Sequence, residues 1–196
     1  DYTVSANNEI AIDTQFDTAN SELPDIPRFG WQLPLIGDYK SMQYYGRGPQ
    51  ENYTDRKTGA LISEYTLSVL DSFHRYSRPQ ETGNHTDVRY ATLKQANGMQ
   101  VTARANSTSV FETSFWPFLQ SDIDFRQGDS EKSASGLIPV TSKHGVDIPI
   151  RDLTTWNIDY KQMGVGGDTS WGRPVHEKYR IKAKPMRFNY SLHWQK

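Results

Sequence analysis

Hydrophobic and polar residues alternate along several stretches of the chain. In residues 10–16, IAIDTQF, and in residues 186–194, MRFNYSLHW, every second side chain is apolar or threonine. Successive side chains of a β-strand point to opposite faces, so this pattern predicts strands with one buried face. The Asn7-Asn8 pair predicts a turn that leads back from a short strand at 2–4.

Further strands are predicted between these two stretches. The segments YATLKQA and MQVTARA flank Asn97-Gly98, which predicts a hairpin with a type I′ turn. Residues 60–73, ALISEYTLSVLDSF, are compatible with a helix, but their alternation and the β-rich surroundings favour a strand. Tyr179, Ile181 and Ala183 predict a strand before Lys184-Pro185.

The order of these elements predicts an all-β fold, a large antiparallel β-sandwich. Long loops are expected at 17–30 and 126–136, where proline or glycine interrupts polar sequence. The chain has no internal repeat and no Pro/Ser-rich linker. We therefore expect a single domain over residues 1–196.

Composition narrows the classes of function. The 196 residues include 22 Lys+Arg and 23 Asp+Glu, a formal net charge of -1, which provides no electrostatic case for binding nucleic acid or an anionic membrane. The absence of cysteine excludes disulfides and thiolate chemistry. No apolar run approaches the ~20 residues of a membrane span. The start, without Met or signal-peptide features, suggests a mature or excised chain.

A glycine-rich stretch at 163–172, MGVGGDTSWG, is the first candidate site. Glycine-rich loops often bind phosphate, whereas a tryptophan on a polar loop often binds a sugar. A dinucleotide fingerprint requires glycine at the sixth position from Gly164, where this chain has Thr169. No P-loop lysine and no helical pattern follow, so the spacing disfavours a phosphate site.

Metal and catalytic motifs are weak elsewhere. The five histidines have no zinc-binding spacing, and no calcium-loop or G-x-S-x-G motif occurs. Asp122 and Asp124 are expected to be surface carboxylates at a strand end. Three glutamates remain candidates for glycoside hydrolysis, although each is expected to be a structural partner of a nearby arginine: Glu51, Glu64 and Glu81.

Two polar stretches combine turn-forming residues with Arg, Asp and Glu. They are residues 44–56, YYGRGPQENYTDR, and residues 78–90, RPQETGNHTDVRY. They allow two interpretations, a polar functional site or a buried network that fixes long loops to the sandwich. Their chemistry alone favours the buried network.

Together with residues 27–35 and 156–172, these stretches carry a resemblance to a known family. YYGRGPQENYTDR resembles G-x-G-P-x-E-N-Y-x-D-R, and RPQETGNHTDVRY resembles R-P-Q-E-N-G-N-R-x-D-V-R, with Thr82 and His85 as departures. PRFGWQLPL is similar to a P-R-x-G motif, and WNIDYKQMGVGGDTSWG to D-x-x-Q-x-G-V-G-G-D-x-S-W. The four blocks, in this order, resemble the C-terminal domain of the family-2 glycoside hydrolases known as β-galactosidases.

The resemblance implies a supersandwich similar to galactose mutarotase, and a loop that reaches an active site on another domain. Trp171 matches the tryptophan that forms a platform for the galactoside or glucose moiety, and Gly166, Gly167, Asp168 and Ser170 would support it. The catalytic glutamates would lie on a (β/α)8 barrel, which at about 250 residues this chain cannot contain. The resemblance thus implies no catalytic residue and no cofactor in this chain. It places Mg and Na on other domains.

Other functions stay open at this point. A stand-alone carbohydrate-binding module would bind sugar through Trp171 without a barrel. A mutarotase-like epimerase would need a His/Glu pair in one pocket, which the scattered histidines do not support. A β-glucuronidase fits the four blocks less well. A bacterial cytoplasm or periplasm is compatible with the sequence, which does not distinguish them.

Overall fold

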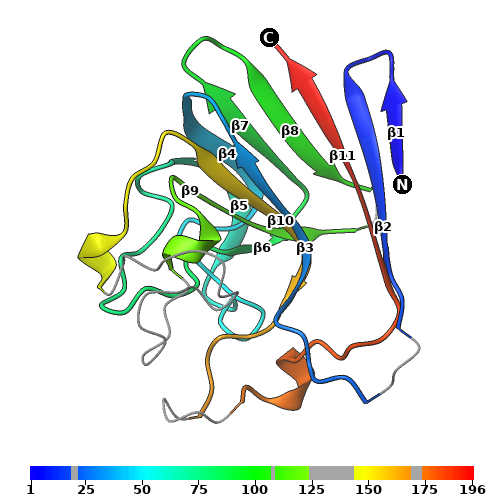
Figure 1. Cartoon of the computed structure of the whole chain (residues 1–196), viewed down its shortest axis with the longest axis vertical. Coiled ribbons are helices and arrows are strands. Elements are labelled where there is room, and N and C mark those ends of the chain that lie inside the picture. Colours follow the sequence, from blue (N-terminus) through cyan, green and yellow to red (C-terminus); the bar gives the residue numbers. More distant parts are fainter. Residues whose placement is uncertain (19–21, 107–108, 124–143, 169–173) are drawn as a thin grey trace.

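The computed structural model of the protein describes residues 1–18, 22–106, 109–123, 144–168 and 174–196. Within these residues, eleven strands form two antiparallel sheets that pack against each other (Figure 1). The only helical elements described are three short 3-10 turns, and no described helix is long and apolar enough to cross a membrane. The predicted all-β sandwich is confirmed.

The larger sheet has seven strands in the order β1-β2-β11-β8-β7-β4-β5. The C-terminal strand β11 lies between β2 and β8, and the C-terminus lies at the top of Figure 1, with the N-terminus lower down on the right. The strand bounds are β1 Tyr2–Ser5, β2 Glu9–Phe16, β4 Tyr39–Gly48, β5 Leu61–Ser68, β7 Tyr90–Gln95, β8 Gln100–Ala105 and β11 Met186–Gln195.

The smaller sheet has four strands in the order β3-β10-β9-β6. These strands are β3 Arg28–Leu35, β10 Thr154–Gln162, β9 Phe111–Trp116 and β6 His85–Val88. The 3-10 turns η1 Gln120–Asp122, η2 Gly145–Asp147 and η3 Glu177–Tyr179 lie in the connections. Strand β10 pairs with both β3 and β9, and its C-terminal end leads directly into the glycine-rich loop.

The local predictions hold for most strands. Residues 61–68 form a strand, and Asn8, with φ 61°, turns the chain between β1 and β2. The β7–β8 hairpin is confirmed, but its type I′ turn is wrong, because only Gly98 has a positive φ, of 89°. Gly98 N–H donates to Gln95 O at 3.1 Å, as in a type I turn followed by a left-handed glycine.

The predicted strand around Tyr179, Ile181 and Ala183 is also wrong. Glu177–Tyr179 form η3, and Ile181 makes only an isolated bridge with Ile26. The Tyr179 carbonyl accepts a hydrogen bond from Gly164 N–H at 3.0 Å. Residues 179–181 therefore form hydrogen bonds with loop residues, whereas the alternation predicts that they pair with a neighbouring strand.

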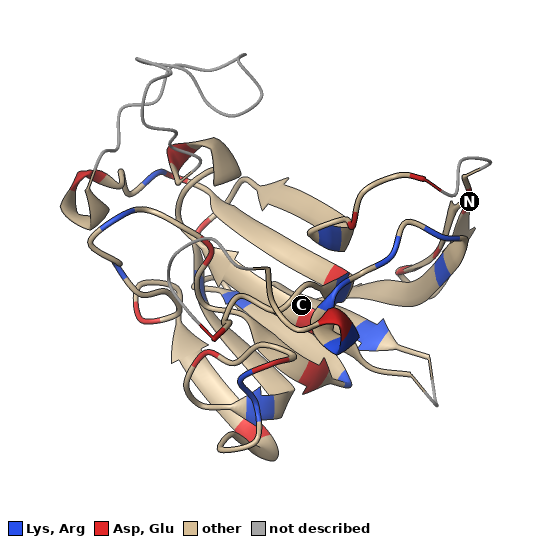
Figure 2. Cartoon of the chain, turned by 90° about the horizontal axis from the view of Figure 1, so that it is seen from below, with Lys and Arg blue, Asp and Glu red and all other residues tan. Residues whose placement is uncertain are grey.

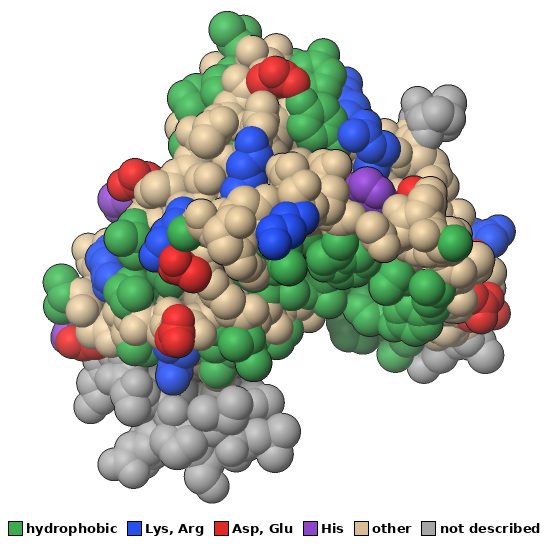
Figure 3. Space-filling model, turned by 90° about the horizontal axis from the view of Figure 1, so that it is seen from above, with side chains coloured by type: hydrophobic (Ala, Val, Ile, Leu, Met, Phe, Trp, Pro, Cys, Tyr) green, Lys and Arg blue, Asp and Glu red, His purple; other side chains and the backbone are tan. Residues whose placement is uncertain are grey.

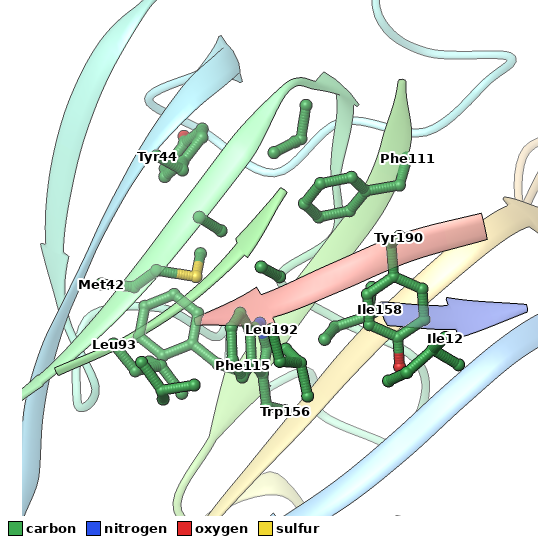
Figure 4. Packing of buried hydrophobic residues seen from close by; sticks show 14 of the residues in the cluster. Ile12, Met42, Tyr44, Leu93, Phe111, Phe115, Trp156, Ile158, Tyr190 and Leu192 are labelled. Atoms are coloured by element: carbon green, nitrogen blue, oxygen red, sulfur yellow. The ribbon is translucent and has the colours of Figure 1, made fainter. Parts of the chain in front are cut away.

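The main hydrophobic core lies between the two sheets (Figure 4). Trp156 and Ile158 of β10 are fully buried and pack with residues of the larger sheet such as Met42, Leu93 and Leu192. The indole Nε1 of Trp156 donates to Thr113 Oγ1 at 2.9 Å, so its polar group is satisfied inside the core.

The smaller sheet is buried on its outer face as well. Thr155, Asn157 and Asp159 alternate with the core residues of β10, yet all three are at most 1% exposed. Loops cover this face, and a second hydrophobic cluster there consists of Trp116, Phe118, Ile123 and Ile148. The loops therefore form a third layer over the sandwich.

Exposed hydrophobic side chains come from several elements; in Figure 3 some lie among polar and charged ones, and others gather in a continuous area right of centre. The most exposed are Ile36 (90%), Val146 (82%), Val4 (75%) and Leu61 (73%), which belong to a loop, to η2, to β1 and to β5. Scattered exposed hydrophobic residues are ordinary on protein surfaces.

The contact between β3 and β10 provides a stability prediction. A Cβ atom added at Gly30 would lie 2.2 Å from Asp159 Oδ1 and 2.6 Å from the Ile158 carbonyl. We expect Gly30→Ala to lower the free energy of unfolding by at least about 2 kcal/mol, measured by urea denaturation. Gly59→Ala is the control, because nothing lies within 4 Å of its added Cβ, and its effect should stay within about 0.5 kcal/mol. Equal effects of the two substitutions would contradict the tight packing.

Candidate functional site

The glycine-rich loop begins at the end of β10 and runs toward the bottom of Figure 1. Gly166, Gly167 and Asp168 are among the described residues, and Asp168 is exposed. Ser170 and Trp171 fall within 169–173, which lie outside the described residues. The site can therefore be followed from β10 to Asp168 and again from residue 174 onward.

The Asp55 carboxylate fastens the start of this loop to the body of the protein. Its Oδ2 accepts a hydrogen bond from Gly166 N–H at 2.7 Å, and its Oδ1 accepts one from Val165 N–H at 3.3 Å. Hydrogen bonds to an ionised acceptor are roughly twice as strong as those between neutral groups. Asp55 and Gly166 are 111 residues apart in sequence, so this contact joins the stretch 44–56 to the glycine-rich block.

The Asp55 carboxylate also explains why positions 164 and 166 are glycine. A Cβ atom at Gly164 would lie 2.6 Å from Asp55 Oδ2, and one at Gly166 would lie 3.0 Å from that oxygen. Neither glycine has a positive φ, so close approach to Asp55 accounts for them and backbone conformation does not.

Further contacts hold both ends of the loop. Met163 N–H donates to the Pro27 carbonyl at 2.8 Å, next to the bond between Gly164 and Tyr179. Asp168 Oδ1 lies 2.8 Å from His176 Nε2, and both side chains are more than half exposed. This contact connects residues before and after the segment 169–173, although contacts between exposed side chains contribute little to stability.

A cavity of about 350 Å³ lies beside these contacts. Figure 2 views the molecule from below, the side of the loop and η3, and shows basic and acidic residues interspersed there. The cavity is lined by Asp55, Arg56, Gly166, Gly167, Asp168, Val175, His176, Lys178 and Tyr179. The structure thus brings Gly166, Gly167 and Asp168 together with Asp55, from the polar stretch 44–56, and with His176, which no sequence pattern indicated.

The two polar stretches form a buried network, as their chemistry favoured. Asn52 and Asn84 exchange backbone and side-chain hydrogen bonds at 2.7 and 3.1 Å, and both side chains are at most 1% exposed. Asn52 Oδ1 also accepts bonds from the backbone and hydroxyl of Thr86. Arg47 Nε donates to Asp87 Oδ2 at 2.5 Å. These contacts tie two long loops to each other and to the smaller sheet.

The three candidate glutamates all have structural partners. Glu81 pairs with Arg28 at 2.7 Å, and Glu51 accepts bonds from Thr82, Gly83 N–H and the Tyr76 hydroxyl. Glu51 also lies 3.6 Å from Arg56. Glu64 accepts from the Tyr90 hydroxyl, where an arginine partner was expected.

Two of the histidines that are scattered in sequence lie together in space. His74 and His85 line a cavity of about 380 Å³ that also includes Glu51. His85 is 1% exposed, and its Nδ1 lies 3.0 Å from the Tyr44 hydroxyl. Burial lowers the pKa of His85 to about 4, so this imidazole is neutral at pH 7.

The expectation of surface carboxylates at the D-x-D sequence is wrong for Asp122. This residue is 5% exposed, and Arg151 donates to both of its oxygens, at 2.6 and 2.7 Å. The bidentate guanidinium offsets the cost of burying the charge. Asp124 lies outside the described residues, among which no group of three or more His, Asp or Glu side chains is arranged to hold a metal.

Two acids are buried side by side beneath the loop layer. Asp159 on β10 and Glu112 on β9 are paired in register, at 0% and 9% exposure. Burial raises the pKa of Asp159 to about 8, although the Arg28 charge opposes the shift. Burial likewise raises the pKa of Glu112 to about 7, opposed by a 2.7 Å hydrogen bond from Asn84 Nδ2.

Arg28 is shared between these groups. Its Nε lies 3.1 Å from Asp159 Oδ2 without a well-aligned hydrogen bond, while its Nη2 donates to Glu81. One guanidinium divided between two carboxylates stabilises each of them less than a dedicated partner would. Asp159 therefore remains mainly protonated at neutral pH.

The fold and the site together place the chain among all-β proteins built as an antiparallel sandwich, with a glycine-rich loop anchored at the end of one strand. Residues 1–192 match the family described as "Beta galactosidase small chain". The chain is 32% identical over 194 residues to a beta-galactosidase of Halalkalibacterium halodurans, covering 97% of this chain and 18% of that protein. It is 33% identical over 182 residues to a beta-galactosidase of Priestia megaterium, covering 93% of this chain and 16% of that protein.

The chain belongs to the beta-galactosidase small-chain family. A beta-galactosidase of Lactobacillus delbrueckii subsp. bulgaricus is similarly related, at 32% identity over 187 residues. In each of these alignments the chain spans less than a fifth of the relative's length. The rest of each relative lies outside the aligned region.

The Asp55 contacts predict how the loop responds to mutation. We expect Asp55→Ala to lower the hydrogen-exchange protection of the Val165 and Gly166 amides at least tenfold, because both lose their acceptor. Asp55→Asn keeps one carbonyl acceptor and should retain part of the protection. Asp38→Asn, at an exposed carboxylate paired with Lys40, is the control. Unchanged protection in Asp55→Ala would contradict the anchoring role.

The buried acids predict how stability depends on pH. In the unfolded chain both carboxyls ionise near pH 4, whereas in the folded protein they keep their protons until about pH 7 and pH 8. The free energy of unfolding should therefore fall as pH rises from 6.5 to 8, by at most about 1.4 kcal/mol per pH unit for each carboxyl. His85 acts with the opposite sign, but only between about pH 4 and its ordinary pKa of 6.5.

Urea denaturation at pH 6.5, 7, 7.5 and 8 measures this dependence. Asp159→Asn removes the group that titrates last and should flatten the profile above pH 7. A wild-type profile that is level or rising over this range, or an Asp159→Asn profile as steep as that of the wild type, would show that the pair does not titrate in this way.

Proposed function

We propose that the chain is the C-terminal β-sandwich domain of a retaining β-galactosidase that hydrolyses terminal β-D-galactosides such as lactose. Membership of the small-chain family supports this proposal, as does the small share of each related beta-galactosidase that the chain spans. In a retaining enzyme one glutamate acts as nucleophile and another as acid/base. Both would lie on a barrel domain, a partner outside this chain.

In this proposal the chain forms part of the wall of the active site and supplies no catalytic residue. Trp171 would offer its indole face to the apolar CH face of a galactose or glucose ring, a contact of about 0.5–1.5 kcal/mol by analogy with aromatic pairs. Gly166, Gly167, Asp168 and Ser170 would support the loop. No residue of the chain is assigned a catalytic role, and Mg and Na would be bound by other domains.

The observation that carries this proposal is the attachment of the loop to Asp55. Two backbone N–H groups of the loop bond to one carboxylate, and a third bonds to the Tyr179 carbonyl. A sugar platform that completes a site on another domain must be held in place, because misplacement by about 1 Å can cost roughly 100-fold in rate. Anchoring of the loop base meets this requirement up to Asp168.

A stand-alone carbohydrate-binding module is the alternative. It would use the same loop, but its binding site would be complete without a barrel. A mutarotase-like activity is less well supported, even though Glu51 and two histidines share a cavity. The Glu51 carboxylate already accepts three hydrogen bonds, and the buried imidazole of His85 is neutral.

The decisive experiment compares Trp171→Ala and Trp171→Phe in the complete parent enzyme. We expect Trp171→Ala to lower kcat/KM for a chromogenic β-galactoside about tenfold, because the platform is lost. Trp171→Phe keeps an aromatic face and should recover part of the loss. Unchanged kcat/KM in Trp171→Ala would contradict the platform role.

The isolated chain provides the control. It should not hydrolyse the chromogenic β-galactoside, and turnover abolished by mutating one of its own carboxylates would overturn the assignment of catalysis to another domain. Titration of the isolated chain with galactose, glucose and lactose, followed by tryptophan fluorescence, tests the alternative. Saturable binding that Trp171→Ala removes would favour the stand-alone module.

A further inference from the structure

A second cavity, of about 410 Å³, lies next to the loop cavity and shares Lys178 and Tyr179 with it. Its volume falls within the range of small-molecule sites. Five segments that are distant in sequence line it: Thr54 and Lys57, Asp87, Ser109–Glu112, Tyr160–Gln162, and Lys178–Ile181. None of the family motifs discussed above assigns a ligand to this cavity.

Basic side chains outnumber acidic ones around the cavity. Lys57 is paired with Asp87 at 2.9 Å, and Arg180 lies 3.8 Å from Asp25. Lys161 and Lys178 have no carboxylate within ion-pair distance among the described residues. Each ammonium lies over a tyrosine ring, at 5.1 and 4.7 Å from the ring centroid. Two positive charges are thus available at the cavity.

The cavity also has two acids held in fixed positions. Asp87 has φ 55°, a strained value for a residue other than glycine, and its carboxylate is held by Arg47 and Lys57. Glu112 is only 9% exposed and bonds to Asn84. The Asp87 carboxylate, held in this way, is a suitable acceptor for ligand hydroxyl groups.

The remaining lining suits a ring with one apolar face. Tyr160 and Tyr179 are half-buried and provide the main aromatic lining, with the nearly buried Ile181 beside them. Thr54, Ser109 and Gln162 add neutral hydrogen-bonding groups. A bare inorganic anion would use only the lysines and would be repelled by Asp87. A sugar that carries one carboxylate would use the lysines, the acceptors and the apolar walls together.

We propose that this cavity binds an acidic sugar unit, with its carboxylate at Lys161 and Lys178 and its hydroxyls toward Asp87 and Gln162. The site goes beyond the proposed function and does not depend on Trp171. An experiment that disproves this binding site would therefore leave the platform role of Trp171 untouched, and the reverse also holds.

The test is calorimetric titration of the full chain with galacturonate, galactose and acetate at pH 7 and low salt. Galacturonate is expected to bind about tenfold more tightly than galactose, the gain expected from two partly exposed ion pairs. Acetate has the charge without the ring and should bind more weakly than galacturonate. Added salt at 0.5 M should weaken binding of galacturonate and leave that of galactose unchanged.

Variants test whether Lys161 and Lys178 cause the preference for galacturonate. In the double variant Lys161→Gln/Lys178→Gln, galacturonate should bind no more tightly than galactose. Lys184→Gln, at an exposed lysine outside the cavity lining, should leave the tenfold preference intact. Circular dichroism verifies that each variant is folded. Equal binding of galacturonate and galactose by the wild type, acetate binding as tight as galacturonate, or loss of the preference in Lys184→Gln would each overturn the proposal.

Discussion

Burial of the smaller sheet on both faces is the constraint on which the rest of the structure depends. One face of β10 meets the larger sheet through Trp156 and Ile158, whereas the other carries Asn157 and Asp159 into an interior that loops close off. Buried polar groups without partners are costly, so this outer face requires polar partners from the loops. Asn84 and Arg28 meet part of this requirement at Glu112 and Asp159. The polar stretches 44–56 and 78–90 are therefore structural in their main role.

The same constraint explains the placement of the glycine-rich loop. β10 is held by β3 and β9 on its two sides, so its C-terminal end is a rigid point of departure. Asp55 belongs to the stretch 44–56, which supplies part of the cover of the smaller sheet, and its carboxylate accepts hydrogen bonds from the loop backbone. A network that satisfies buried polar groups thus also positions a surface loop. This arrangement links motifs that are far apart in sequence.

Much of the fold could be predicted from the sequence, because alternation is a local signal. The strands at 10–16 and 186–194 followed from it, and so did the β7–β8 hairpin. A strand was also expected within 60–73, of which the structure has residues 61–68 in β5. The type of turn at Asn97-Gly98 could not be predicted from the dipeptide. Asn-Gly fits a type I′ turn, in which both residues have a positive φ, and also the observed turn, in which only Gly98 does. The strand expected at Ile181 failed because alternation cannot show whether a neighbouring strand is available. The expectation of one domain over residues 1–196 stays a prediction.

For the site, the sequence by itself determined the residue types and their order: a glycine-rich loop after a strand, two polar stretches, and the resemblance that singles out Trp171. Only the tertiary structure decided that Asp55 holds the loop, that Glu112 and Asp159 share a buried face, and that Lys161 and Lys178 border one cavity. The physical reason is that alternation and turn chemistry act between neighbours in the chain. Hydrogen-bond acceptors, burial and charge pairing act between residues that only the folded chain brings together, as Asp55 and Gly166 show across 111 positions.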